Sequence, residues 1–184
     1  MIVVNLFGVP GAGKSTGAAY IFSKLKMMGF NAELITEFVK DKVWENNQEV
    51  FKNQAYIFGK QSFKMSRCKG KVDILVTDSP LLLSAFYNSD AVLGEAFNKV
   101  VLDVFNSYEN INFLINRVKP YNPIGRNQTE SESDAMKEPI EKMLYSMNIS
   151  FSAIDGDIKY YYEIAKLIDR RMKMRKQEGI NGNG

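Results

Sequence analysis

The stretch that most limits how this 184-residue chain can fold is GVPGAGKS, residues 8–15. It contains a glycine, four further residues and then Gly-Lys-Ser, which is the Walker A pattern, and Thr16 adds a second hydroxyl. In this pattern backbone N–H groups surround phosphate oxygens, the lysine places its charge on the β and γ phosphates, and the serine binds Mg²⁺. The residues predicted to bind a nucleotide here are Gly8, Gly11, Ala12, Gly13, Lys14, Ser15 and Thr16.

The segments on either side of this stretch fit a phosphate-binding loop. Residues 2–7 (IVVNLF) are mostly apolar and β-branched, which predicts a strand buried on both faces. Residues 14–28 predict a helix, and Gly29 stands where a helix ends in a residue with positive φ. A bound phosphate would therefore lie at a helix N-terminus, where unpaired N–H groups and the helix dipole favour anions.

Apolar runs recur along the rest of the chain with helical segments between them. The further runs are residues 32–36, 73–78, 111–116 and 149–154. Such alternation is typical of βαβ units and predicts an α/β fold with a mainly parallel sheet. Residues 119–133 (KPYNPIGRNQTESES) are rich in turn residues, and we expect a lid there, over about residues 117–133.

Composition narrows the chemistry that is available. The chain has no histidine and one cysteine, Cys68, which excludes imidazole catalysis and an internal disulfide framework. A net charge of +3 is too small to indicate nucleic-acid binding by itself. We expect one domain over residues 1–170 and a basic, flexible tail over residues 171–184. With neither a signal peptide nor a membrane span predicted, the expected location is cytoplasmic.

Two acidic residues follow predicted strands, at the sheet edge where ligands bind in parallel folds. Asp78 ends the run KVDILVTD, and we expect it to hold Mg²⁺ together with Ser15 or to accept a proton as a general base. Capping of the next helix is the alternative. Glu37 follows the second run and is a candidate for the general base or for orienting a substrate hydroxyl. The alternative is a surface glutamate at the start of the next helix.

Residues 47–65 predict a helix with two glutamines on its apolar side. Gln54 and Gln61 are seven residues apart and point almost the same way. Burying an unpaired amide costs about 1–3 kcal/mol, so each amide needs a partner. One partner would be a flat ring of a second substrate, stacked on Phe58, Phe51 or Trp44. Bonding to nearby backbone is the equal alternative.

Basic residues and a glycine turn complete the candidate site. Arg126 in the predicted lid, and Arg117 at the fourth strand's end, are candidates for stabilising a phosphoryl group in transfer. Solvated loop charges are the alternative. Gly156, in AIDGD (153–157), predicts a turn beneath the base of the nucleotide or simply a tight connection.

The order of these features resembles the P-loop nucleoside and nucleotide kinases. The Walker A loop, Glu37, the glutamine helix, VTDSP, the Arg/Lys lid and the DGD turn are similar to those of ribosylnicotinamide-kinase-like and thymidylate-kinase-like proteins. Small phage-encoded members of that branch are labelled AAA-type ATPases. The resemblance implies a P-loop three-layer α/β/α fold with a five-stranded parallel sheet, an ATP donor, and Mg²⁺ held by Ser15 and Asp78. The chain departs from it in two places: Ser79 and Pro80 follow Asp78 where an Asp/Glu-Arg pair is usual, and Lys40 replaces an arginine.

The function expected on this basis is transfer of the γ-phosphate of ATP to a nucleoside, nucleotide or related small molecule. The proposed catalytic set is Lys14, Asp78, Glu37, Arg117 and Arg126, and the proposed acceptor set is Glu37, Trp44, Gln54, Phe58 and Gln61. A kinase acting on a hydroxymethyl pyrimidine in DNA is the less favoured alternative, and an NTPase switch or motor is the third. The expected partners are a nucleotide donor and a small-molecule acceptor. We expect no membrane association, and a homodimer is compatible with the sequence.

Overall fold

The computed structural model describes residues 1–38, 49–126 and 128–181. Its strands are β1 (Ile2–Phe7), β2 (Ala32–Ile35), β3 (Ile74–Thr77), β4 (Glu109–Asn116) and β5 (Ser152–Asp155). Its helices are α1 (Lys14–Met27), α3 (Glu49–Lys52), α4 (Gln54–Ser66), α5 (Leu83–Phe86), α6 (Gly94–Asn106), α7 (Glu130–Ala135), α8 (Lys137–Ser146) and α9 (Ile158–Asn181).

The five strands form one parallel sheet in the order β2-β3-β1-β4-β5. Every residue of β1 is buried, because this strand is central and both faces of the sheet are covered. The predicted α/β fold with a five-stranded parallel sheet is confirmed. Strands β2 and β3 lie on one side of β1, and strands β4 and β5 lie on the other. The loop after β1 is therefore at the topological switch point, where parallel sheets bind ligands.

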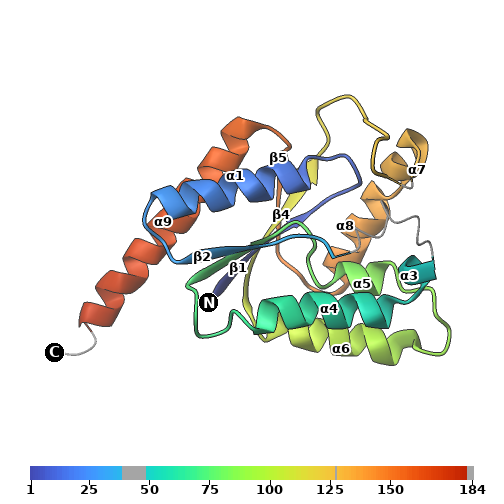
Figure 1. Ribbon diagram of the computed structural model, residues 1–184, viewed down its shortest axis with the longest axis horizontal. Helices are drawn as coiled ribbons and strands as arrows, with labels where there is room; N and C mark the ends of the chain where they lie inside the picture. Colours follow the sequence, from blue (N-terminus) through green and yellow to red (C-terminus); the bar gives the residue numbers. More distant parts are fainter. Residues whose placement is uncertain (39–48, 127, 182–184) are drawn as a thin grey trace.

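Helices cover both faces of the sheet and give the predicted three layers. Helices α1 and α9 lie side by side on one face, and α4, α5 and α6 lie together on the other (Figure 1). The segment after β4 rises above the sheet and returns into α7, at the end of the molecule where the first loop also lies (Figure 1). The lid and the phosphate-binding loop are thus neighbours at the carboxyl ends of the strands.

The predicted glutamine helix and the predicted fifth strand have different bounds in the structure. Within residues 49–65 the predicted single helix is two helices, because Asn53 is non-helical (φ −100°, ψ 79°) and its side chain caps α4 by accepting from the Tyr56 N–H. The fifth strand begins at Ser152 rather than residue 149. Asn148 takes a positive φ of 55° and the Ile149 N–H bonds Leu144, so these residues complete the end of α8 first.

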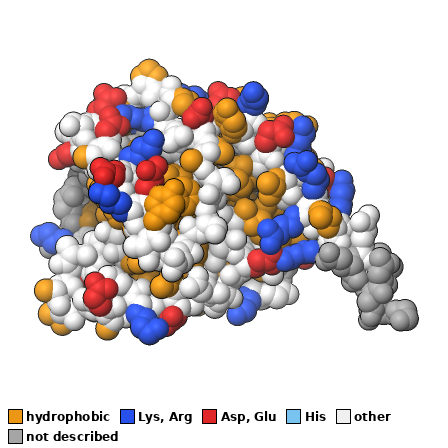
Figure 2. All heavy atoms as spheres, turned by 180° about the vertical axis from the view of Figure 1, so that it is seen from behind, with side chains coloured by type: hydrophobic (Ala, Val, Ile, Leu, Met, Phe, Trp, Pro, Cys, Tyr) orange, Lys and Arg blue, Asp and Glu red, His pale blue; other side chains and the backbone are white. Residues whose placement is uncertain are grey.

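The last helix is longer than the sequence indicates. Helix α9 continues through residue 170 to Asn181, and residues 171–181 of the predicted tail are its last turns. Arg171 and Arg175 both pair with Glu109 at the start of β4. Figure 2 shows basic side chains, with acidic ones among them, gathered toward the C-terminal end of the molecule. Over the described residues, none of the helices has the length and apolar character needed to span a bilayer.

Candidate functional site

The first loop of the sheet has the geometry of a phosphate-binding site. Strand β1 ends at Phe7 and α1 begins at Lys14, so the N–H groups of the first turn of α1 are open to a ligand. The Lys14 ammonium donates to the carbonyl oxygens of Gly8 (2.8 Å) and Val9 (3.0 Å), which holds it over the loop. Burial lowers the pKa of Lys14 below its ordinary value, and the nearby carboxylates of Glu37 and Asp78 partly offset that effect.

Tyr161, which no sequence pattern indicated, supports the loop on the side away from the cavity. The Tyr161 hydroxyl, from the first turns of α9, donates to the Gly13 carbonyl at 3.1 Å. Gly13 has φ +100°, and a Cβ atom there would lie 2.6 Å from the same hydroxyl, so only glycine fits. The available signal for this contact was a tyrosine one turn into the helix after the last strand. Its partner, Gly13, lies 148 residues away in the sequence.

Gly156 also contacts the loop. An added Cβ atom would lie 2.2 Å from the Ala12 carbonyl oxygen, and the Gly156 N–H bonds Asn116 at 2.9 Å. The DGD turn therefore packs against the back of the phosphate-binding loop, and Gly156 does not line the cavity in front of it. The role of this turn beneath a nucleotide base stays a prediction.

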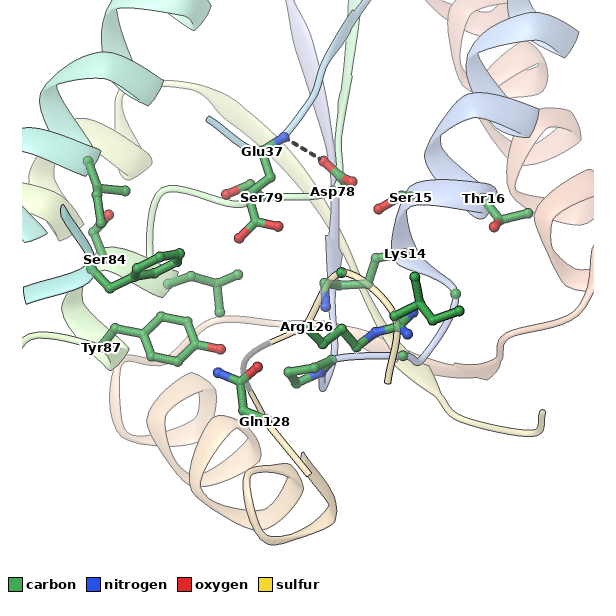
Figure 3. Close-up of a pocket in the computed structure, with 18 of the residues that line it drawn as sticks. Lys14, Ser15, Thr16, Glu37, Asp78, Ser79, Ser84, Tyr87, Arg126 and Gln128 are labelled. Atoms are coloured by element: carbon green, nitrogen blue, oxygen red, sulfur yellow. Dashed lines mark hydrogen bonds between the residues drawn. The ribbon is translucent and has the colours of Figure 1, made fainter. Parts of the chain in front are cut away.

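The two strand-end carboxylates lie together. Asp78 is buried and accepts a hydrogen bond from the Glu37 N–H at 3.0 Å, which ties the end of β2 to the end of β3. Figure 3 shows the Asp78 carboxylate pointing toward the Ser15 hydroxyl. These are hard oxygen ligands of the kind that Mg²⁺ takes together with waters and substrate phosphates. Among the described residues no group of three His, Cys, Asp or Glu side chains is placed to hold a metal.

A cavity of about 490 Å³ extends from the loop to helices α4 and α5. This volume is in the range of small-molecule sites. Its lining residues are Pro10, Gly11, Gly13, Lys14, Ser15, Thr16, Glu37, Phe51, Gln54, Ile57, Asp78, Ser79, Leu83, Ser84, Tyr87, Ile124, Gly125, Arg126 and Gln128. One continuous space therefore joins the phosphate-binding loop, both carboxylates and a wall of uncharged side chains (Figure 3).

The two glutamines have different surroundings. Gln54 lines the cavity, with its amide N–H₂ donating to the Phe51 carbonyl at 2.9 Å. Gln61 lies outside the cavity lining and donates to the Ser79 carbonyl (3.2 Å) and the Thr77 hydroxyl (3.4 Å). Both amides therefore donate to a nearby backbone carbonyl, which is the alternative kept open by the sequence.

The predicted aromatic platform is only partly in place. Phe51 lines the cavity, whereas Phe58 packs edge to face against Phe97 with ring centroids 5.7 Å apart. Phe58 is absent from the cavity lining because it turns toward α6. Trp44 lies outside the described residues.

The two predicted arginines are separated by the ring of Tyr121. Arg126 lines the cavity and lies close enough to Lys14 for its positive charge to lower the pKa of Lys14. Arg117 does not line the cavity, and its guanidinium pairs with Glu130 (3.2 Å) and Asp134 of α7. The Tyr121 ring lies 5.0 Å from the Arg117 guanidinium carbon and 5.4 Å from that of Arg126.

The lid is docked on the phosphate-binding loop. The buried Ser133 hydroxyl in α7 donates to the Pro10 carbonyl at 2.7 Å. Thr129 caps α7 in a capping box with Glu132, which fixes where that helix begins. The Tyr121 ring packs on Gly11, since an added Cβ atom there would lie 3.0 Å from it. The sequence located the lid but did not indicate these contacts.

Ser84 and Tyr87 are cavity residues that the sequence analysis missed. Both come from the short helix α5 and its end, six and nine residues after Asp78. Burial and the neighbouring Glu37 raise the pKa of Tyr87 to about 12. The available signal was their short separation from Asp78 in the sequence, because a turn that follows a strand-end carboxylate often contributes to the same cleft.

Comparison with known proteins gives one family. The sequence model of a family described as an AAA domain matches residues 3–160, which include the loop, both carboxylates and the lid. None of the curated proteins matches the chain.

Proposed function

Because the chain belongs to the family of AAA domains, which carry the phosphate-binding loop of P-loop NTPases, we propose that it is an ATP-dependent phosphotransferase. Its acceptor would be a nucleoside, a nucleotide or a related small molecule. The observation that carries this proposal is the extent of the cavity, which continues past Lys14 to Gln54 and Tyr87. A hydrolase needs room only for water beyond the γ-phosphate, whereas the extension of the cavity past Lys14 would be the place of a second molecule.

The donor end of the site would work as follows. The N–H groups at the start of α1 and the Lys14 ammonium would bind the β and γ phosphates. Ser15 and Asp78 would hold Mg²⁺, which neutralises charge on the phosphates when bound. The ammonium of Lys14 is already buried, so phosphate binding would replace its bonds to Gly8 and Val9 with stronger charged ones.

The acceptor end supplies a base and a shield from water. In the described part of the cavity lining the carboxylates are those of Glu37 and Asp78, and one of them would take the proton of an attacking hydroxyl. Arg126 enters from the lid side and would stabilise the phosphoryl group during transfer. Docking of α7 on Pro10 would keep the lid over the site and exclude water that competes with the acceptor.

We assign Arg117 a different role from the one expected from sequence. Its side chain is only 10% exposed and is paired with two carboxylates of α7. A guanidinium so engaged is a positioning group, which would hold the lid, and through Tyr121 the Arg126 side chain, in place. Direct contact with phosphate is left to Arg126.

The test is a transfer assay with ATP labelled at the γ-phosphate, Mg²⁺ and a panel of nucleosides, nucleotides, nicotinamide riboside and DNA containing hydroxymethyl pyrimidine. We expect label on a small-molecule acceptor, and none with the Lys14→Ala protein. Label on the DNA alone would favour the nucleic-acid kinase. Label released only as inorganic phosphate, independent of any acceptor, would favour an NTPase switch and contradict the proposal.

A further inference from the structure

We propose that the surface where the strands of the sheet begin binds the phosphate backbone of double-stranded nucleic acid. This surface lies at the opposite end of the molecule from α7 and the phosphate-binding loop (Figure 1). The inference does not depend on the proposed phosphotransferase function. It comes from basic side chains of three segments that are distant in the sequence and that the fold brings together.

The three basic segments are the end of α1, the turn after α4 and the end of α9. All of them lie at the end of the molecule where the parallel strands begin (Figure 1). Their lysines and arginines, called the basic end below, are Lys24, Lys26, Arg67, Lys69, Lys71, Arg170, Arg171, Lys173, Arg175 and Lys176. Lys24 is half-buried and the others are exposed, so the basic end is open to a ligand.

Contacts between the segments make the basic end one continuous surface. The Lys69 ammonium lies 5.9 Å from the centre of the Tyr108 ring. The next residue, Glu109, pairs with Arg171 of α9 at 2.9 Å. On the other side, the Asn31 amide, which follows the end of α1, donates to a carbonyl of the turn after α4 at 2.6 Å. The turn after α4 therefore joins the ends of α1 and α9.

The charge balance at this end differs from that of the whole chain. Ten basic side chains stand here against three acidic ones, over residues 24–31, 66–73, 108–109 and 169–176. The whole chain has 24 against 21, so the remaining residues have 14 against 18 and are net negative. The small net charge of the chain thus conceals a strongly basic surface, which attracts polyanions.

The acidic side chains at this end are too few to neutralise it. They are Asp73, Glu109 and Asp169. Asp169 pairs with Lys173, and Glu109 pairs with two arginines of α9. Most of the basic end is therefore without a counter-charge among the described residues, and phosphate groups would supply it.

Arginine is concentrated at the basic end, as phosphate recognition favours. The chain has six arginines, and four of them lie here. A planar guanidinium binds a phosphate through two parallel hydrogen bonds, which a lysine ammonium does not. Within the described part of the chain Arg67 and Arg170 form no ion pair, so both are free to bind phosphate.

The basic end lacks the apolar face that a membrane-binding helix needs. Such a helix inserts a continuous apolar face into the bilayer. The apolar stripe of α9 is instead buried against the body of the protein, with Ile168 and Met172 in the core. The exposed large apolar side chains of the basic segments are Met27, Met28 and Met174. Single methionines do not form such a face, so nucleic acid suits this surface better than lipid.

The basic end also suits a duplex better than a single strand. Proteins that bind single strands stack the bases on exposed aromatic rings. The aromatic rings at this end, Phe30 and Tyr108, are half-buried and pack against the core. Contacts would therefore be made to the sugar–phosphate backbone, which is the same for every sequence.

The first experiment measures binding of the full chain to two fluorescent DNA duplexes of unrelated sequence. We expect equal affinity for the two duplexes, because the backbone carries no sequence information. The affinity should fall at least about 100-fold between about 50 and 200 mM salt, which corresponds to about four phosphate contacts. Absence of binding at the lower salt concentration, or affinity that does not change with salt, would overturn the inference.

A pair of double variants locates the binding surface. Arg67→Gln with Arg170→Gln removes two charges from the basic end, and Lys60→Gln with Lys137→Gln removes two from exposed positions elsewhere. We expect the first variant to lower duplex affinity at least about tenfold and to reduce the salt slope by about two, with ATP affinity unchanged. The second should bind the duplex like the wild type. Equal losses in the two variants would show that binding follows net charge alone and overturn the inference.

Two further measurements test the place and the kind of partner. Lys26→Gln with Lys176→Gln, from the other parts of the basic end, should weaken duplex binding to a similar degree. ATP with Mg²⁺, added at constant ionic strength, should not displace the duplex, because the phosphate-binding loop lies at the other end. Displacement by ATP would overturn the inference. Binding to phosphatidylserine vesicles without binding to either duplex would identify a membrane surface instead and would also overturn it.

Discussion

The Tyr161 hydroxyl donates a hydrogen bond to the Gly13 carbonyl oxygen at 3.1 Å and so connects the last helix to the phosphate-binding loop. Tyr161 is 2% exposed, and its ring packs along α1 close to Gly17. Burial and the neighbouring Asp157 raise the pKa of Tyr161 to about 12, so the hydroxyl remains a donor over the whole working range of pH. The shape of the loop therefore depends on a residue outside the cavity lining.

Removal of this hydroxyl should loosen the loop. For Tyr161→Phe we expect the free energy of unfolding to fall by about 0.5–1.5 kcal/mol and ATP affinity to fall a few-fold, because the Gly13 carbonyl keeps only its bond from the Gly17 N–H. Tyr162→Phe, at a partly exposed neighbour, is the matched control and should leave both quantities unchanged. Urea unfolding and ATP titration measure them. A Tyr161→Phe protein indistinguishable from the control would contradict this role.

Two helical glycines offer a test of the same packing. A Cβ atom at Gly17 in α1 would lie 2.5 Å from the Tyr161 ring, whereas at Gly59 in α4 it would meet nothing within 4 Å. Gly59→Ala should stabilise the chain by about 0.5–1 kcal/mol through helix propensity. Gly17→Ala should destabilise it by about 1–3 kcal/mol through overpacking. Thermal unfolding with and without ATP measures both, and equal effects of the two changes would show that Tyr161 does not pack on α1 as described.

Most of the fold could be predicted because its signals are local. The buried strand Ile2–Phe7, the loop after it and the helix that ends near Gly29 each follow from neighbouring residues. The break at Asn53 was also local, yet the apolar pattern continues across it and conceals it. The late start of β5 was not predictable, because the end of α8 and the strand use the same apolar residues.

The site was less predictable where it depends on contacts between distant segments. Glu37 and Asp78 could be placed together, because parallel strands end at the same edge. The amides of Gln54 and Gln61 could not be told apart, since both lie on the same side of α4 and only their positions along the helix axis differ. The bond from Ser133 to Pro10 joins residues 123 apart, and no sequence pattern links them.

The ion pairs of Arg117 should matter for the lid. For Arg117→Met we expect a loss of about 1–2 kcal/mol in stability, faster proteolysis in the lid and a higher KM for ATP, because α7 loses its anchor. Lys99→Met removes an exposed pair with Asp103 and should cost less than about 0.5 kcal/mol. Limited proteolysis and steady-state kinetics measure these effects. A large fall in kcat with an intact lid would instead indicate direct contact of Arg117 with phosphate.

The burial of Lys14 predicts a pH dependence of stability. In the unfolded chain its pKa is about 10.5, and in the folded chain it is lower, so the folded chain binds fewer protons between these values. The free energy of unfolding should therefore rise with pH in that window. Lys14→Met removes this contribution, and we expect the stability of the wild type relative to the variant to increase as the pH rises toward 10.5. Denaturant unfolding at several pH values measures it, and a falling difference would contradict the burial of a charged Lys14.

The most direct measurement follows the γ-phosphate of ATP in a single reaction, quantifying nucleoside diphosphate, inorganic phosphate and phosphorylated acceptor together. The structure has one space that joins Lys14, Glu37 and the wall of Gln54 and Tyr87. We predict that each diphosphate formed is matched by one phosphorylated acceptor, that inorganic phosphate stays a minor product, and that all three vanish with Lys14→Ala. Diphosphate matched by inorganic phosphate at a rate independent of acceptor concentration would contradict the account.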